Sequence, residues 1–121
     1  MQGGASRASP HQDTRDFISL LLRRAGYDVT EAATAARALR LAEAGDFDLY
    51  LLDHQFPDAS GVTLCRRLRA AHPHAPILFY SGRAMEAERE EAMRAGAQEY
   101  LIKPQDIFRV VERVAEFLGP A

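Results

Sequence analysis

An unbroken apolar run that ends in a carboxylate limits the possible folds of this chain more than any other feature. Leu49–Leu52 reads Leu-Tyr-Leu-Leu, and Asp53 follows directly. Such a run is typical of a strand buried on both faces, as in a parallel sheet covered by helices. Residues 54–61 are rich in turn formers and indicate a loop. Ligands of open α/β sheets bind beyond the carboxyl ends of strands, so Asp53 is either placed for chemistry or caps the following turn.

Two more strands are expected to end in polar side chains. Ile77–Tyr80 is a second buried-type strand followed by Ser81, and Glu99–Ile102 is followed by Lys103. Strands that alternate with helices predict a doubly wound α/β fold, with all three strand ends at one edge of one parallel sheet. The expected helices cover residues 12–25, 34–42, 61–72, 84–95 and 105–118, with a further strand over 27–31. In the first helix, Phe17, Leu20 and Leu21 form the predicted core-facing stripe.

Composition excludes several functional classes. The 121 residues suit one domain, and 15 basic against 17 acidic residues give a net charge of -2, which produces no field to recruit nucleic acid or anionic membrane. No stretch approaches the roughly 20 apolar residues of a membrane span. The single cysteine, Cys65, excludes an internal disulfide and lies on an apolar helix face as a predicted core residue. We therefore expect a cytoplasmic protein that binds neither nucleic acid nor membrane through this domain.

The three strand ends bring together a carboxylate, a hydroxyl and an ammonium group, which suits covalent phosphoryl chemistry. The Asp53 carboxylate can act as a nucleophile toward phosphorus and form an acyl phosphate. Lys103 can pair with one oxygen of the doubly charged phosphoryl group, and Ser81 can donate a hydrogen bond to another. The backbone amide of Gly82 or of the following residue can donate as well. Each residue alone is a weak signal, but the combination at successive strand ends is specific.

On these motifs the chain resembles the receiver domain of two-component response regulators, over about residues 11–118. The matching segments are Leu51-Leu52-Asp53 followed by Pro57 and Gly61, then Tyr80-Ser81-Gly82, and Gly96 through Pro104. The resemblance implies a flavodoxin-like doubly wound parallel sheet, (βα)5, with strand order 2-1-3-4-5. It also implies structural roles for Gly61 and for Pro104, with a cis peptide bond before the proline.

The resemblance further implies residue roles. Asp53 would accept phosphate from a histidine kinase or phosphotransfer protein, with Lys103, Ser81 and Gly82 binding the phosphoryl group. Tyr100 would turn inward as the Ser81 hydroxyl moves toward the phosphate. Such a domain is not an enzyme beyond its own phosphorylation and autodephosphorylation, and it takes no small-molecule substrate.

The resemblance also implies where partners bind, because receivers of this family share one docking face. An output partner or a second copy of the chain would bind where the fourth helix, the last strand and the last helix meet. The candidate residues on this face are Arg83, Arg94, Arg109 and Arg113.

The amino terminus departs from the family pattern. Receivers open with an apolar strand and an acidic pair that binds Mg²⁺ with the phosphoacceptor; here that pair falls on Ser9 and Pro10. Asp53 and the Gln55 backbone carbonyl remain as metal ligands, with Asp13 the nearest substitute acid, so we expect weak or absent Mg²⁺ binding. We divide the chain into an atypical or disordered segment, 1–10, and a receiver domain, 11–121, whose first strand is weak or missing. Either residues 5–9 still pair through their backbone, or another chain fills the gap, or the amino terminus is altered.

Two other functions remain open. A pseudo-receiver would use the same fold as a phosphorylation-independent interaction or dimerisation module. A flavodoxin-like phosphatase would need a second acid where this chain has Gln55, and flavin binding would need a phosphate-cradling loop after the first strand. His54 should point away from Asp53 and have a structural or loop role, and His72 and His74 lack a third metal ligand.

Overall fold

Strands and helices alternate along the part of the chain that the computed structural model describes, residues 4–8 and 12–119, with side chains from residue 17 onward. The strands are β1 (Gly4–Ala8), β2 (Asp28–Ala32), β3 (Leu49–Leu52), β4 (Ile77–Ser81) and β5 (Glu99–Ile102). The helices are α1 (Gln12–Arg24), α2 (Ala35–Ala44), α3 (Gly61–Ala71), α4 (Glu86–Arg94) and α5 (Ile107–Leu118). The predicted helices differ from these only by a few residues at their ends.

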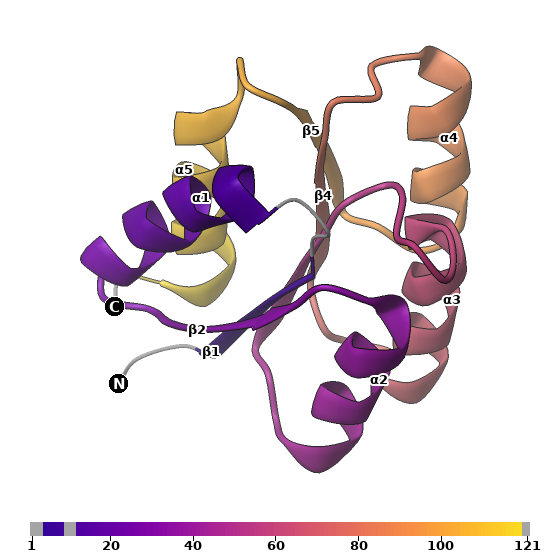
Figure 1. Cartoon of the computed structure of the whole chain (residues 1–121), viewed down its shortest axis with the longest axis horizontal. Coiled ribbons are helices and arrows are strands. Elements are labelled where there is room, and N and C mark those ends of the chain that lie inside the picture. Colours follow the sequence, from indigo (N-terminus) through magenta and orange to yellow (C-terminus); the bar gives the residue numbers. More distant parts are fainter. Residues whose placement is uncertain (1–3, 9–11, 120–121) are drawn as a thin grey trace.

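The strands form one parallel sheet in the order β2-β1-β3-β4-β5. Helices α1 and α5 cover one face, and α2, α3 and α4 cover the other (Figure 1). This arrangement confirms the predicted flavodoxin-like doubly wound fold. It also places the carboxyl ends of β3, β4 and β5 side by side at one edge of the sheet. No helix within the described residues is long and apolar enough to cross a membrane.

The first strand, expected to be weak or missing, is present and central. Residues 4–8 pair with β2 from Gly4 to Ala8 and with β3 from Ala5 to Ala8. Of the three explanations considered, pairing through the backbone is the one that the structure has. A sheet ladder is made by main-chain N–H and C=O groups, so a polar sequence can take part in it. Ser9 and Pro10 lie outside the described residues.

Alternation along the strands divides the core into two clusters, which explains the unbroken apolar run of β3. Leu49 and Leu51 face the α1–α5 side, where they pack with Leu78 of β4. Tyr50 and Leu52 face the other side, where they pack with residues of α2, α3 and α4. All four residues are buried because both faces are covered.

The predicted apolar stripe of α1 is wrong for two of its three residues. Phe17 and Leu20 are 52% and 50% exposed, whereas Ile18 and Leu22 are fully buried and Leu21 is partly buried against the same cluster. Apolar residues at 17, 18, 20, 21 and 22 span more than half a helical turn, so periodicity alone does not indicate which side faces the sheet. The burial of Ile18 and Leu22, one turn apart, defines the inner face.

Candidate functional site

Asp53 and Lys103 form an ion pair at the carboxyl edge of the sheet. Asp53 follows β3 and Lys103 follows β5, and the Lys103 ammonium donates to Asp53 Oδ2 at 2.9 Å. The side chains are only 7% and 12% exposed, so the pair is shielded from water. The peptide bond between Lys103 and Pro104 is cis, as expected. The ammonium of Lys103 lies over the ring of Tyr80, with Nζ 5.5 Å from its centroid.

The loop after β3 holds the Asp53 carboxylate from its other side. The backbone N–H of His54 donates to Asp53 Oδ1 at 2.7 Å, and the Gly61 N–H donates to the His54 carbonyl at 2.6 Å. A Cβ at Gly61 would lie 2.0 Å from the Asp53 carbonyl oxygen, closer than any side chain allows. Gly61 therefore lets the start of α3 close against the strand end.

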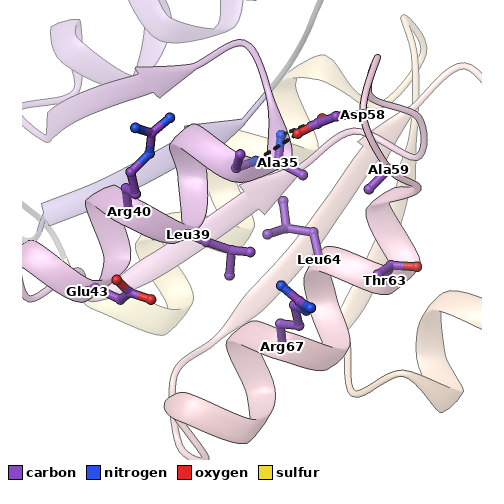
Figure 2. Close-up of a pocket in the computed structure, with 10 residues that line it drawn as sticks. Ala35, Leu39, Arg40, Glu43, Asp58, Ala59, Thr63, Leu64 and Arg67 are labelled. Atoms are coloured by element: carbon purple, nitrogen blue, oxygen red, sulfur yellow. Dashed lines mark hydrogen bonds between the residues drawn. The ribbon is translucent and has the colours of Figure 1, made fainter.

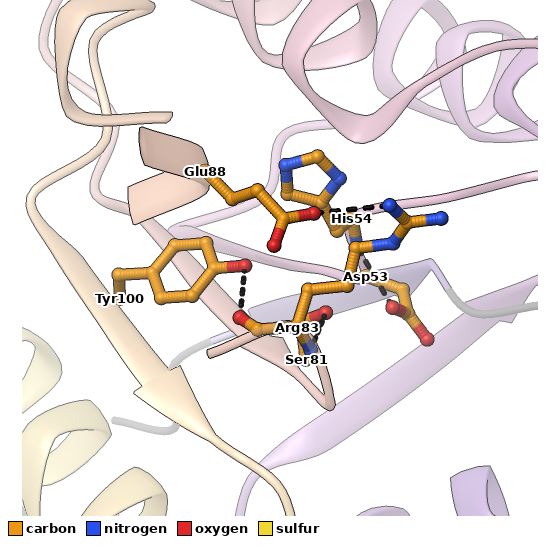
Figure 3. Close-up of polar contacts among 6 residues, drawn as sticks. All are labelled: Asp53, His54, Ser81, Arg83, Glu88 and Tyr100. Carbon is orange, nitrogen blue, oxygen red and sulfur yellow. Dashed lines mark hydrogen bonds and ion pairs between the residues drawn. The ribbon is translucent and has the colours of Figure 1, made fainter. Parts of the chain in front are cut away.

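Ser81 and Tyr100 are linked through the backbone of Arg83 (Figure 3). The Arg83 N–H donates to Ser81 Oγ at 3.1 Å, and the Tyr100 hydroxyl donates to the Arg83 carbonyl at 2.7 Å. Tyr100 is 5% exposed and stacks on Phe79, so its ring faces inward. Burial raises the pKa of the Tyr100 phenol; hydrogen bonding with the Ser81 hydroxyl and the charge of Arg83 oppose this effect, whereas Glu88 and Asp53 add to it. The net change is upward, so the hydroxyl stays protonated as a donor at neutral pH.

His54 lies beside Tyr100 within the covered face of the sheet. Its ring centroid is 6.2 Å from those of Phe79 and of Tyr100, with the Tyr100 ring nearly perpendicular. The residue is buried, and neither ring nitrogen has a hydrogen-bond partner among the residues that the structure describes. Its side chain thus packs with aromatic residues and not with the Asp53–Lys103 pair.

A family model described as the response regulator receiver domain matches residues 9–115. The chain belongs to this family. The matched range includes the ends of β3, β4 and β5, where Asp53, Ser81 and Lys103 lie.

Curated relatives support the assignment. This receiver domain is 33% identical over 100 residues to the regulatory protein VanR of Enterococcus faecium, covering 83% of the chain and 42% of the relative. It is 32% identical over 105 residues to the transcriptional regulatory protein CusR of Escherichia coli, covering 87% and 46%. The chain therefore spans less than half the length of these relatives.

Solved structures agree on the fold. A CheY-like response regulator receiver domain protein from Methanospirillum hungatei has a TM-score of 0.90 and 26% identity, covering 96% of this chain and 93% of that one. A response regulator from Burkholderia pseudomallei has a TM-score of 0.84 and 29% identity, covering 97% and 66%. That protein was solved with a phosphorylated aspartic acid, a calcium ion and citrate.

The remaining predicted residues lie at the edges of this receiver site. Gly82 is exposed, with open space around its Cα, and directly follows Ser81. Gln55 is exposed, and its side chain donates to the carbonyl of Phe56 at 3.3 Å.

The predicted docking arginines are engaged within the chain or exposed. Arg83 pairs with Glu88 at 3.0 Å, Arg109 with Asp106 at 3.5 Å, and Arg113 with Glu99 at 2.9 Å. Arg94 is exposed near the end of α4. A partner at this face would therefore meet ion pairs already formed.

The residues whose side chains the structure describes, from residue 17 onward, do not form a complete Mg²⁺ site. Receiver domains typically bind Mg²⁺, and the ligands expected in this chain are the Asp53 carboxylate and the Gln55 backbone carbonyl. Both Asp53 oxygens already accept hydrogen bonds, from His54 and Lys103. No cluster of three or more His, Cys, Asp or Glu residues suits a metal within the described part of the chain, and the Asp13 side chain lies outside it.

Asp58 is a structural residue that the sequence analysis missed. Its two carboxylate oxygens accept from the N–H groups of Ala35 and Ala36, each at 3.0 Å, so the loop after β3 caps the start of α2. These hydrogen bonds lower the pKa of Asp58. The partners are more than 20 residues away along the chain, and only the folded topology brings them together.

Asp58 also borders a groove of about 480 Å³ between α2 and α3, lined by Leu39, Leu64, Arg40 and Arg67 among others (Figure 2). None of the strand-end residues lines this groove. The groove is therefore separate from the Asp53 site.

Proposed function

We propose that this receiver domain accepts a phosphoryl group on Asp53 and relays the change through Ser81, Tyr100 and Lys103. The supporting observation is the shielded contact of 2.9 Å between the Lys103 ammonium and the Asp53 carboxylate. In this proposal the Lys103 ammonium is the cation that lies beside the carboxylate to which the phosphoryl group is attached. Phosphorylation of an aspartate is typical of the family, and the Burkholderia relative carries one.

In the proposed reaction an Asp53 carboxylate oxygen attacks phosphorus and forms the acyl phosphate bond. The bond between phosphorus and the donor, a phosphohistidine of a kinase or phosphotransfer protein, breaks, and its electron pair leaves with the donor nitrogen. Lys103 then transfers its ion pair from the carboxylate to a phosphoryl oxygen. Ser81, which already accepts from Arg83, can donate its hydroxyl hydrogen to a second oxygen. The only reactions of the domain itself would be this transfer and its later hydrolysis.

Arg83 is the proposed connection between the site and the surface. Its N–H is bonded to Ser81 and its carbonyl to Tyr100, so movement of Ser81 toward a phosphoryl group moves the loop that holds Tyr100. The Arg83 guanidinium is paired with Glu88 of α4. Phosphorylation would thus shift a two-state equilibrium at the face formed by α4, β5 and α5, where an output protein or a second copy binds.

Two observations favour a pseudo-receiver as the second candidate. Among the residues whose side chains the structure describes, there is no cluster of three or more His, Cys, Asp or Glu that could hold a metal, and the Tyr100 ring faces inward. A domain held in this state would bind its partner independently of phosphorylation. Both candidates use the same face.

The test is the intact mass of the protein after incubation with acetyl phosphate, with and without Mg²⁺. We expect a gain of one phosphoryl group that is absent in Asp53→Asn. Asp58→Asn is the matched control, because it removes a nearby exposed carboxylate that is not at a strand end, and it should keep the gain. Without any gain under either condition, the phosphorylation proposal fails and the pseudo-receiver is the better account.

A further inference from the structure

We propose that His54 is a positioning residue that weakens the inward state of Tyr100. With the buried imidazole at position 54, the inward state of Tyr100 is less favourable than it would be with an apolar side chain at that position. The proposal rests on the switch role of Tyr100 proposed above. It concerns the equilibrium between the two Tyr100 positions, not the chemistry at Asp53.

The structural basis is a polar ring enclosed by aromatic side chains. His54 is 7% exposed, and neither Nδ1 nor Nε2 has a hydrogen-bond partner among the described residues. Phe79 and Tyr100 lie against the imidazole. The charged groups drawn near it in Figure 3 have other partners: Glu88 pairs with Arg83, and Asp53 pairs with Lys103.

Tyr100 forms one side of this enclosure. Its ring meets the imidazole at 74°, edge to face, and its hydroxyl is held on the Arg83 carbonyl. When Tyr100 turns outward, this cover is removed and water can reach the imidazole nitrogens. The unpaired polar atoms therefore disfavour the inward state and not the outward one.

A buried polar group without a partner is expensive, whereas an apolar group of similar shape in the same place is not. Replacing His54 by leucine keeps the packing against Phe79 and Tyr100 and removes both nitrogens. The backbone contacts of residue 54, to Asp53 Oδ1 and from Gly61, do not depend on its side chain. The typical cost of such a group corresponds to roughly a five-fold or larger shift of the Tyr100 equilibrium toward the inward state.

The experiment measures how often Tyr100 is outward in the unphosphorylated protein. Tetranitromethane nitrates exposed tyrosine, and peptide mass spectrometry gives the rate at each tyrosine separately. Because Tyr100 is inward in this structure, its nitration rate is proportional to the minor outward population. In His54→Leu we expect nitration of Tyr100 to slow by about five-fold or more.

Internal and matched controls separate this effect from a change in stability. Tyr27, Tyr50 and Tyr80 are buried in the core, and their nitration reports unfolding of the whole domain. His74→Leu makes the same exchange at an exposed histidine and should leave the Tyr100 rate unchanged. His54→Met is a second apolar variant with a more adaptable side chain, in case the leucine does not fit.

An unchanged or faster Tyr100 rate in a folded apolar variant, with the core tyrosines still protected, would overturn the proposal. The assay needs neither a phosphodonor nor a metal. Its failure is therefore distinguishable from failure of Asp53 to gain a phosphoryl group in the mass experiment.

Discussion

Replacing Lys103 by methionine should destabilise the domain by about 3 kcal/mol. Methionine keeps most of the length of the side chain and removes the ammonium group that lies 2.9 Å from Asp53 Oδ2. Removing one partner of a buried ion pair typically costs roughly 3–5 kcal/mol, because the other charge is left uncompensated. We expect the lower end of that range, since Asp53 keeps the hydrogen bond from the His54 N–H.

The assay is urea unfolding of four proteins: the wild type, Lys103→Met, Asp53→Asn and the double variant. In the double variant there is no buried charge to compensate, and the amide oxygen introduced by Asp53→Asn can still accept from the His54 N–H. The double variant should therefore be more stable than the sum of the single effects predicts, by about 2 kcal/mol. In thermal unfolding, the Lys103→Met change corresponds to a decrease of about 10 °C in Tm.

Additive effects would refute this reasoning. If Lys103→Met costs less than about 1 kcal/mol and the double variant shows no coupling, the pair behaves as an exposed surface ion pair.

The loop and the core allow three more tests. Gly61→Ala should lower the free energy of unfolding by about 2 kcal/mol, because its Cβ would lie 2.0 Å from the Asp53 carbonyl oxygen. Gly82→Ala, whose Cβ would meet nothing within 4 Å, should be nearly neutral in the same urea experiment. Equal losses of stability in the two variants would contradict the close approach at Gly61. Burial raises the pKa of the Cys65 thiol to about 11, so iodoacetamide should modify it at pH 8 only after unfolding, and rapid reaction of the native protein would disprove its core position. The lowered pKa of Asp58 stabilises the folded state at pH values above the ordinary Asp pKa of about 4, and this stabilisation is lost as the pH falls through the folded-state pKa. Urea unfolding across pH should therefore show a smaller loss of stability in acid for Asp58→Ala than for the wild type. Identical profiles would contradict the role of the Asp58 hydrogen bonds to α2.

The sheet was predictable because its strands carry strong local signals. The Leu49–Leu52 run is apolar throughout, which indicates burial on both faces, and both core clusters contain part of it. The first strand was harder, because residues 4–8 have a polar sequence and pair through backbone groups that are the same for every residue. The orientation of α1 was also beyond sequence reasoning, since its apolar residues surround more than half of the helix.

Part of the candidate site was likewise predictable from the sequence, and part was not. Asp53, Ser81 and Lys103 could be placed together from the sequence because parallel strands bring their carboxyl ends to one edge, whatever the details of packing. The link from Ser81 to Tyr100 runs through the main chain of Arg83, and a backbone carbonyl has no sequence signature.

The chain itself carries the alternation of strands and helices, the polar residues at the strand ends and the family motifs, because these depend on neighbours along the sequence. The packing of the His54 imidazole against Phe79 and Tyr100, the closure of Gly61 on Asp53 and the capping of α2 by Asp58 depend on segments that meet only after folding. Hydrogen bonding and steric fit act over a few ångströms in space, whatever the separation along the chain. Such contacts therefore became visible only in the tertiary structure.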